Sequence, residues 1–180
     1  MRVTGGNLKG RAIGTGFASH VRPSTDRMRE SMFNSLQHQI GIQHAHILDL
    51  FSGSGIIALE FLSRNAEKVT SVDLDRKNIL FQKNTKTQFN LPNWEILSGN
   101  ALKLPFELDL HFDIIFADPP YHMADLQSMP LTLLPLLDPN NPDAVLIFEH
   151  KPQLVFPENC SPFQQKDYGS SVLSYFQRNH

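Results

Sequence analysis

The sequence lacks most of the features that mark disulfide-bonded, membrane-spanning or metal-binding proteins. A single cysteine, Cys160, occurs in 180 residues, which is typical of a reducing compartment and leaves no internal disulfide. No apolar run approaches the ~20 residues that a membrane-spanning helix needs, and the first residues contain no apolar signal core. The eight histidines show no metal-ligand spacing. We therefore expect a cytoplasmic protein with no membrane contact and no bound metal.

The net charge of −2 hides an uneven distribution. Residues 1–30 contain six Lys and Arg and two Asp and Glu, so this part carries +4 and the rest of the chain carries −6. The six basic residues are Arg2, Lys9, Arg11, Arg22, Arg27 and Arg29. A basic segment on an acidic body is what a polyanion-binding enzyme needs, but short basic ends are also common where they are merely solvated. Charge alone leaves both interpretations open.

Strand and helix patterns alternate along most of the chain. Short apolar runs predict strands at residues 46–50, 69–74, 94–97, 112–117 and 144–148. Helical patterns lie between them at residues 56–62, 76–90 and 123–137. This alternation predicts an α/β protein with a doubly wound, mostly parallel sheet. Ligands of such sheets bind beyond the carboxyl ends of the strands, so we expect the functional residues there.

The two ends of the chain predict smaller elements. Residues 1–22, rich in Gly and basic residues, are expected to form a basic β-hairpin extension ahead of a single domain at residues 23–180. A helix is predicted to follow, with Ser24 or Thr25 as its N-cap. Residues 164–168 and 172–177 flank a Gly-Ser-Ser turn and predict a closing antiparallel hairpin.

A glycine-containing loop follows the first predicted strand. Gly53 and Gly55 allow a tight turn that passes close to a ligand. Residues 53–58 also satisfy the dinucleotide pattern G-x-G-x-x-A, so a pyrophosphate at the following helix is an alternative. Asp49, four residues before the first glycine, argues against this alternative, because its carboxylate would repel a pyrophosphate. It suits a cofactor whose nearby end carries an ammonium and a sulfonium.

The next two strands supply further cofactor candidates. Asp73, at the end of the second, could hydrogen-bond ribose hydroxyls in either type of cofactor, whereas Asp75 is expected to cap the next helix. Asn100, after the third, could contact an adenine edge or serve only as a turn residue. The predicted cofactor residues are Asp49, Phe51, Gly53, Ser54, Gly55, Asp73, Leu74, Asn100 and Ala101. Their layout resembles the Rossmann-like class I methyltransferase fold, and this resemblance implies S-adenosylmethionine as the cofactor.

The fourth predicted strand leads directly into Asp118, Pro119, Pro120 and Tyr121. An exocyclic base amine is a poor nucleophile, so an enzyme that methylates it must hold it with acceptors that favour the transition state. The Asp118 carboxylate and the Pro119 carbonyl could be these acceptors, in a backbone stiffened by two prolines. Tyr121 offers a ring on which an extruded base can stack. A strand-ending turn without chemistry is the alternative. This segment resembles the motif of amino methyltransferases acting on adenine N6, guanine N2, cytosine N4 and related amide nitrogens, and alone it does not choose among them.

The choice of amine depends on a resemblance to one family. The stretches RVTGGNLKGR at residues 2–11, RPSTDRMRESMFN at 22–34, LDLFSGSG at 48–55 and YGSSVL at 168–173 are similar to the bacterial 16S ribosomal RNA guanine-N2 methyltransferase family, the type acting at guanine 966. The similarity covers essentially the whole chain, although that family often has Glu where this chain has Asp73. It implies base contacts at residues 118–121 and RNA contacts by the basic residues named above. Arg22, Arg27 and Arg29 could equally pair with Asp26 and Glu30.

The resemblance also implies 16S ribosomal RNA as the partner, either free or in an assembling small-subunit particle, and we expect a monomer. Two other functions stay open at this point. An adenine-N6 methyltransferase acting on DNA or RNA would use the same Asp-Pro-Pro-Tyr motif. A non-catalytic basic RNA-binding module would not need Asp118 at all.

Overall fold

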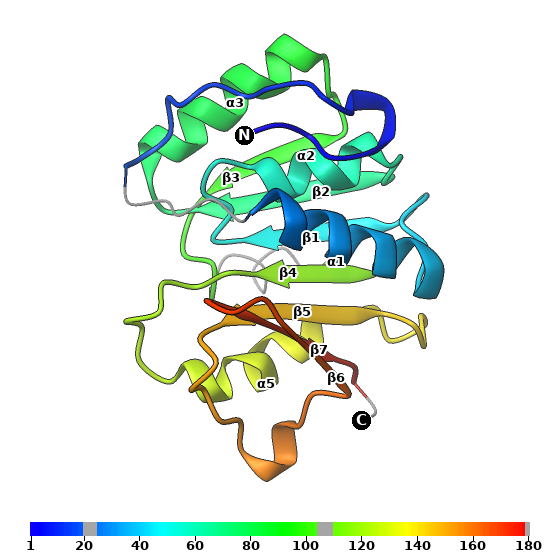
Figure 1. The fold of residues 1–180 in the computed structure, drawn as a ribbon, viewed down its shortest axis with the longest axis vertical. Helices are drawn as coiled ribbons and strands as arrows, with labels where there is room; N and C mark the ends of the chain where they lie inside the picture. The colour runs from blue at the N-terminus through cyan, green and yellow to red at the C-terminus, as the bar shows by residue number, and fades with distance from the viewer. Residues whose placement is uncertain (20–24, 104–109, 179–180) are drawn as a thin grey trace.

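The computed structural model describes residues 1–19, 25–103 and 110–178. Within these ranges, seven strands form one sheet in the order β3-β2-β1-β4-β5-β7-β6 (Figure 1). The strands are β1 (His46–Leu50), β2 (Lys68–Asp73), β3 (Trp94–Ser98), β4 (Ile114–Ala117), β5 (Val145–His150), β6 (Gln164–Asp167) and β7 (Val172–Phe176). The strands β1 to β5 run parallel, and β7 pairs antiparallel with both β5 and β6. The predicted parallel sheet and its closing hairpin are therefore confirmed.

Helices cover both faces of this sheet. The α-helices are α1 (Asp26–Gln39), α2 (Ile56–Ser63), α3 (Arg76–Phe89) and α5 (Met129–Leu133). One apolar core packs α1 and α2 against strand side chains such as Ile47 and Ile114. A second core packs α5 against Leu48 and Ile115. Successive side chains of a strand point to opposite faces, so each buried strand needs apolar residues at both of these alternating positions.

The segment predicted as one helix over residues 123–137 is broken into three pieces. It consists of η2 (Leu126–Ser128), α5 and η3 (Leu134–Leu136), of which η2 and η3 are short 3-10 helices. Pro130 and Pro135 lie within this segment, and proline has no backbone N–H to donate to the preceding turn. The apolar periodicity predicted which side chains of this segment lie in the core but did not predict the interruptions of the helix.

The amino-terminal arm (residues 1–19) is built into the domain. Its predicted hairpin is a loop closed by a single antiparallel bridge, Arg2–Ala12, around η1 (Gly6–Leu8) in place of two strands. Val3 and Ile13 are 1% and 5% exposed and belong to the core shared with α1 and α2. The arm therefore contributes to the core of the domain and is not an appendage to it.

Two edges of the sheet differ in what they hold. The carboxyl ends of β1 to β5 lie toward the left in Figure 1, and we call this side the carboxyl edge. Because β7 is antiparallel to β5, with Val172 opposite His150, the turn at residues 168–171 lies at this edge too. The opposite edge holds η1, where the Leu8 N–H donates to the Ser63 hydroxyl at the end of α2. Within the described ranges, every helix is too short or too polar to span a bilayer.

Candidate active site

The loop between β1 and α2, residues 51–55, has an unusual backbone that we call the glycine loop. Phe51, Gly53 and Gly55 all have positive φ, at 58°, 52° and 74°. This region of backbone space is strained for side chains other than glycine. A Cβ on Gly55 would also lie 2.7 Å from the Trp94 ring, so both the conformation and the space require glycine there. Trp94 itself is fully buried and fixed by a hydrogen bond from its Nε1 to the Ser71 hydroxyl.

Two side chains of α3 hold the glycine loop and the end of β2 together. Asp73 accepts hydrogen bonds from the Gly53 N–H at 2.7 Å and from Asn78 Nδ2 at 3.3 Å. Gln82 donates to the Gly53 carbonyl at 2.8 Å and to the Ser52 hydroxyl at 2.9 Å. Sequence reasoning missed Asn78 and Gln82, although their spacing of four residues places both on one face of the helix. They fix the backbone from which a cofactor would be bound.

Asp49 is a buried carboxylate with an unused oxygen. Its side chain is 1% exposed, and Oδ2 has no hydrogen-bond partner in the structure. Burial first, and then the charge of Asp73, raise the pKa of Asp49 to about 8, while hydrogen bonds from the Ala58 backbone and Ser71 act in the opposite direction. A cation placed at Oδ2 would offset both of the effects that raise this pKa. The site therefore fits a ligand whose nearby end is positively charged.

The reacting segment (residues 118–121) begins where β4 ends. Ala117 is registered with Leu50 of β1 and Phe148 of β5, so Asp118 enters the carboxyl edge between the glycine loop and the end of β5. Pro119 is buried and Asp118 partly exposed. Tyr121 is half-buried, and the ammonium of Lys151 lies 5.4 Å from the centroid of its ring. The topology therefore brings the predicted cofactor and reacting residues to one edge of the sheet.

The other predicted cofactor residues differ in their surroundings. Leu74 directly follows Asp73 and is 68% exposed, which leaves an apolar surface beside the predicted ribose contact. Ser54 and Ala101 are buried. The side-chain Oδ1 of Asn100 accepts a hydrogen bond from the Leu102 N–H at 2.8 Å, which is the contact of a turn residue. Asp75 caps α3, as predicted, because its carboxylate accepts from the Lys77 N–H.

The predicted RNA-binding residues fall into three groups. Arg2, Lys9, Arg11 and Arg27 are exposed. Arg22 lies outside the described residues. The prediction for Arg29 is wrong, because its side chain is 0% exposed.

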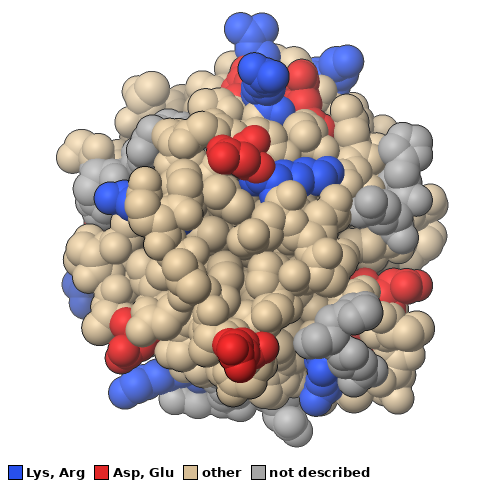
Figure 2. Space-filling model, turned by 60° about the horizontal axis from the view of Figure 1, so that its bottom comes forward, with Lys and Arg blue, Asp and Glu red and all other residues tan. Residues whose placement is uncertain are grey.

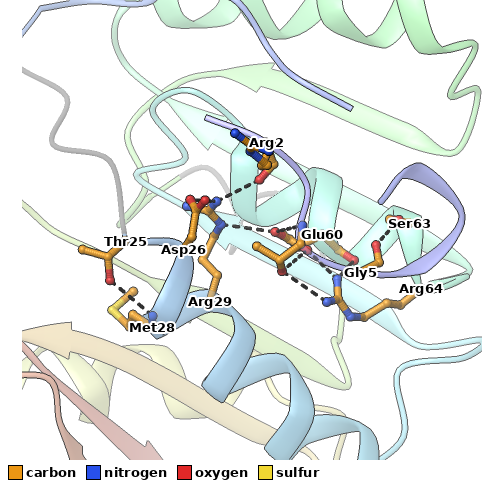
Figure 3. A network of polar contacts seen from close by, with 10 residues as sticks. Arg2, Gly5, Thr25, Asp26, Met28, Arg29, Glu60, Ser63 and Arg64 are labelled. Carbon is orange, nitrogen blue, oxygen red and sulfur yellow. Dashed lines mark hydrogen bonds and ion pairs between the residues drawn. The ribbon is translucent and has the colours of Figure 1, made fainter. Parts of the chain in front are cut away.

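The Arg29 guanidinium takes part in a buried network instead of facing solvent. It pairs with Asp26 at 2.7 Å and with Glu60 of α2 at 3.2 Å, and it donates to the Arg2 carbonyl (Figure 3). Glu60 also pairs with Arg64. The pairing with Asp26 matches the alternative left open by the sequence, whereas Glu60 lies too far along the chain to be foreseen.

Comparison with known proteins places the chain in a family. Residues 1–177 match the model of the family described as Conserved hypothetical protein 95. The chain belongs to this family. This member of the Conserved hypothetical protein 95 family is similar to Ribosomal RNA small subunit methyltransferase D of Haemophilus influenzae. The two are 34% identical over 185 residues, which cover 97% of this chain and 91% of the relative. The resemblance drawn from the sequence motifs is confirmed.

Solved structures confirm the fold class of this Conserved hypothetical protein 95 member. The Escherichia coli protein yhhF superposes with a TM-score of 0.83 at 29% identity, over 99% of this chain and 97% of that one. SMU.776, a structure that contains SAH, superposes with a TM-score of 0.64 at 16% identity, over 83% of this chain and 48% of that one. The architecture is the Rossmann-like class I methyltransferase fold.

Proposed function

We propose that this chain uses S-adenosylmethionine to methylate the exocyclic N2 amine of a guanine in small-subunit ribosomal RNA. One observation carries the proposal. The partner-free oxygen of buried Asp49 and the Asp-Pro-Pro-Tyr segment meet at the same edge of a class I methyltransferase sheet. A binding module would not need either feature. A dinucleotide would bring a pyrophosphate to Asp49, which already experiences repulsion from Asp73.

The residues of the glycine loop and β2 fit S-adenosylmethionine. Asp49 would hold the cationic methionine end, because an ammonium or sulfonium beside Oδ2 would offset the burial and the charge of Asp73 that raise the pKa of its carboxyl. Asp73 would hydrogen-bond the ribose, and the exposed Leu74 would pack on the adenine. Gly53 and Gly55 keep side chains away from the bound molecule. When bound, S-adenosylmethionine supplies an electrophilic methyl group on its sulfonium.

The reacting segment then prepares the amine. Its lone pair is delocalised into the base, and it becomes nucleophilic as the nitrogen turns pyramidal. Asp118 and the Pro119 carbonyl accept hydrogen bonds from the two amine hydrogens, which stabilises positive charge developing on the nitrogen. The ring of Tyr121 stacks on the base and aligns the amine with the methyl group. The amine loses one proton during or after transfer, so Asp118 does not have to be a strong base.

The nature of the substrate is supported by the relatives. The Haemophilus influenzae and Escherichia coli relatives are both named Ribosomal RNA small subunit methyltransferase D. Guanine N2 as the acceptor is supported by the family resemblance of the amino-terminal motifs. We propose 16S ribosomal RNA, free or in an assembling particle, as the partner of a cytoplasmic, monomeric enzyme. The exposed residues Arg2, Lys9, Arg11 and Arg27 are the proposed phosphate contacts.

Substitution of Asp118 tests this function. Asp118→Ala should lower turnover by ~10²-fold or more, since it removes an acceptor for the developing charge. Its affinity for S-adenosylmethionine, measured by calorimetry, should stay within about twofold of the wild type. Asp138→Ala, at a turn remote from the carboxyl edge, is a matched control. Retained turnover in Asp118→Ala would remove Asp118 from the chemistry.

Mass mapping identifies the product directly. Small-subunit ribosomal RNA from cells with and without the gene should differ by one methyl group on a guanine. Nuclease digestion and fragmentation of the nucleoside then locate that group on N2. A methyl group on adenine N6 would establish the alternative amino methyltransferase, and no difference at all would refute ribosomal RNA as the substrate.

A further inference from the structure

Lys151 lies beside the reacting segment but belongs to a different strand. It directly follows β5, and its exposed side chain places Nζ 5.4 Å from the centroid of the Tyr121 ring. A cation over an aromatic face is attracted by the negative charge density of that face. The contact therefore joins the end of β5 to the last residue of the segment that presents the amine.

The backbone at Lys151 is fixed by a buried histidine. His150 is 1% exposed, and its Nδ1 lies 2.8 Å from the Lys151 carbonyl. A carbonyl can only accept, so Nδ1 carries the proton and Nε2 accepts from the Ser174 hydroxyl at 2.7 Å. The Phe156 ring packs edge-on against the imidazole. Burial lowers the pKa of His150, which keeps this arrangement neutral at physiological pH. The Lys151 side chain thus leaves from a rigid point.

The charge around the site makes a cation there useful. Asp73 and Asp118 both lie at the carboxyl edge, and their carboxylates repel a polyanion. Two cations of the amino-terminal arm are remote from it. Lys9 follows η1 at the opposite edge, and the Arg11 guanidinium lies over the ring of Phe89, the last residue of α3.

The face of the molecule shown in Figure 2 has no continuous basic patch among its described residues. This view brings the lower end of the molecule in Figure 1 forward, where β6, β7 and α5 lie. Among the described residues on this face, Lys and Arg side chains are scattered between Asp and Glu and do not gather into one patch. A phosphate contact on this face would therefore come from an individual cation and not from a basic patch.

We propose that Lys151 is a substrate-positioning residue that binds an RNA phosphate next to the target nucleotide while its stem lies along Tyr121. The inference rests on the proposed function and adds the residue that holds the target RNA strand at the carboxyl edge. A base stacked on Tyr121 keeps its sugar and phosphates beside the ring, within reach of a lysine that already contacts it. In the free protein the ring of Tyr121 holds the ammonium in place.

The test uses the intact enzyme and unmethylated small-subunit ribosomal RNA, free or as a particle, whichever the wild type methylates. Lys151→Gln should raise KM for RNA roughly tenfold, as expected for one lost charge-assisted hydrogen bond, and leave kcat within about twofold. The slope of log affinity against log salt should become shallower by roughly 0.7 to 0.9. Lys151→Arg should restore both quantities, because a guanidinium also binds phosphate.

Lys68→Gln is the matched control. Lys68 begins β2 at the opposite edge and pairs with Glu95, so this change removes the same charge far from the site. It should leave KM for RNA and the salt slope unchanged. If Lys151→Gln lowers kcat without changing KM or the salt slope, Lys151 only supports Tyr121, and the inference is overturned. If Lys151→Gln behaves like the control, the inference fails although the proposed function stands. Failure of the wild type to methylate the RNA would instead refute the proposed function.

Discussion

At the scale of single residues, Asp49 is the side chain whose chemistry depends most on its surroundings. The structure raises its pKa from the usual 3.8 to about 8. As pH rises through this window, Asp49 ionises in the unfolded chain before it ionises in the folded protein. The stability associated with the protonated carboxyl is complete below pH 4 and is lost progressively up to about pH 8. Asp49→Asn should therefore make the free energy of unfolding, measured in urea, depend less on pH between 5 and 8 than in the wild type.

Cofactor binding gives a second measurement on the same residue. A cation beside Oδ2 favours the ionised carboxylate, so binding of S-adenosylmethionine near pH 7 should release part of a proton. Calorimetry in two buffers of different ionisation enthalpy reports this release. Asp49→Asn should bind more weakly and release none. Equal proton release by both proteins would show that Asp49 does not face the cationic end.

The residues of the site differ in whether the sequence alone could predict them. The positions of Asp49, Asp73 and Asp118 followed from strand ends, because parallel strands bring their carboxyl ends to one edge. Asn78 and Gln82 could not be assigned, because a buried amide on an amphipathic helix becomes informative only once its partner loop is known. Arg29 was misassigned for the same reason: its partner Glu60 is 31 residues away.

At the scale of elements, a buried ionic network fixes α1 and the amino-terminal arm to α2. Glu60 accepts hydrogen bonds from the Thr4 N–H, the Thr4 hydroxyl and the guanidinium groups of Arg29 and Arg64 (Figure 3). Arg64 also lies over the Phe33 ring of α1, at 4.4 Å. Such a network stabilises the folded protein little more than apolar side chains of the same size would. Removal of one member, however, leaves a buried charge without a partner, and this is strongly destabilising.

Glu60→Gln should therefore lower the free energy of unfolding by about 3–5 kcal/mol, because two guanidinium groups lose their shared buried partner. Urea unfolding monitored by circular dichroism measures the change. Glu67→Gln provides the control, since the Glu67 side chain pairs with His44 at the exposed surface and its loss should change stability by less than about 1 kcal/mol. Similar losses in the two variants would mean that the network does not hold α1 and the arm.

Elements whose pattern is local were predicted well, and those shaped by distant contacts were not. The strands β1 to β5 and the helices α2 and α3 appear at their predicted places because burial on both faces of a sheet imposes a readable apolar pattern. The arm has its shape because residues 4–8 dock on the end of α2. A Cβ on Gly6, for example, would lie 1.9 Å from the Ser63 carbonyl oxygen. No periodicity within the arm encodes that contact.

At the scale of the whole molecule, the arm combines a structural role with a charged surface. Val3 and Ile13 lie in the core, whereas Lys9 and Arg11 are exposed at the edge opposite the site. RNA that reaches both Lys9 and the reacting segment must therefore extend across the molecule. The two roles predict different effects of substitution, and two variants of the full chain separate them.

Val3→Ala should destabilise the protein by on the order of 2 kcal/mol, because it removes two buried methyl groups from a core shared with α1 and α2. Its RNA affinity at a temperature where it remains folded should match the wild type.

The double variant Lys9→Gln and Arg11→Gln should keep the wild-type melting temperature within about 2 °C and flatten the salt dependence of RNA binding by roughly one to two units. Melting curves and filter binding at several salt concentrations measure both. A Val3→Ala protein that melts with the wild type would make the arm a detachable extension after all. An unchanged salt slope in the double variant would mean that Lys9 and Arg11 do not contact RNA phosphates. The RNA would then be confined to the carboxyl edge.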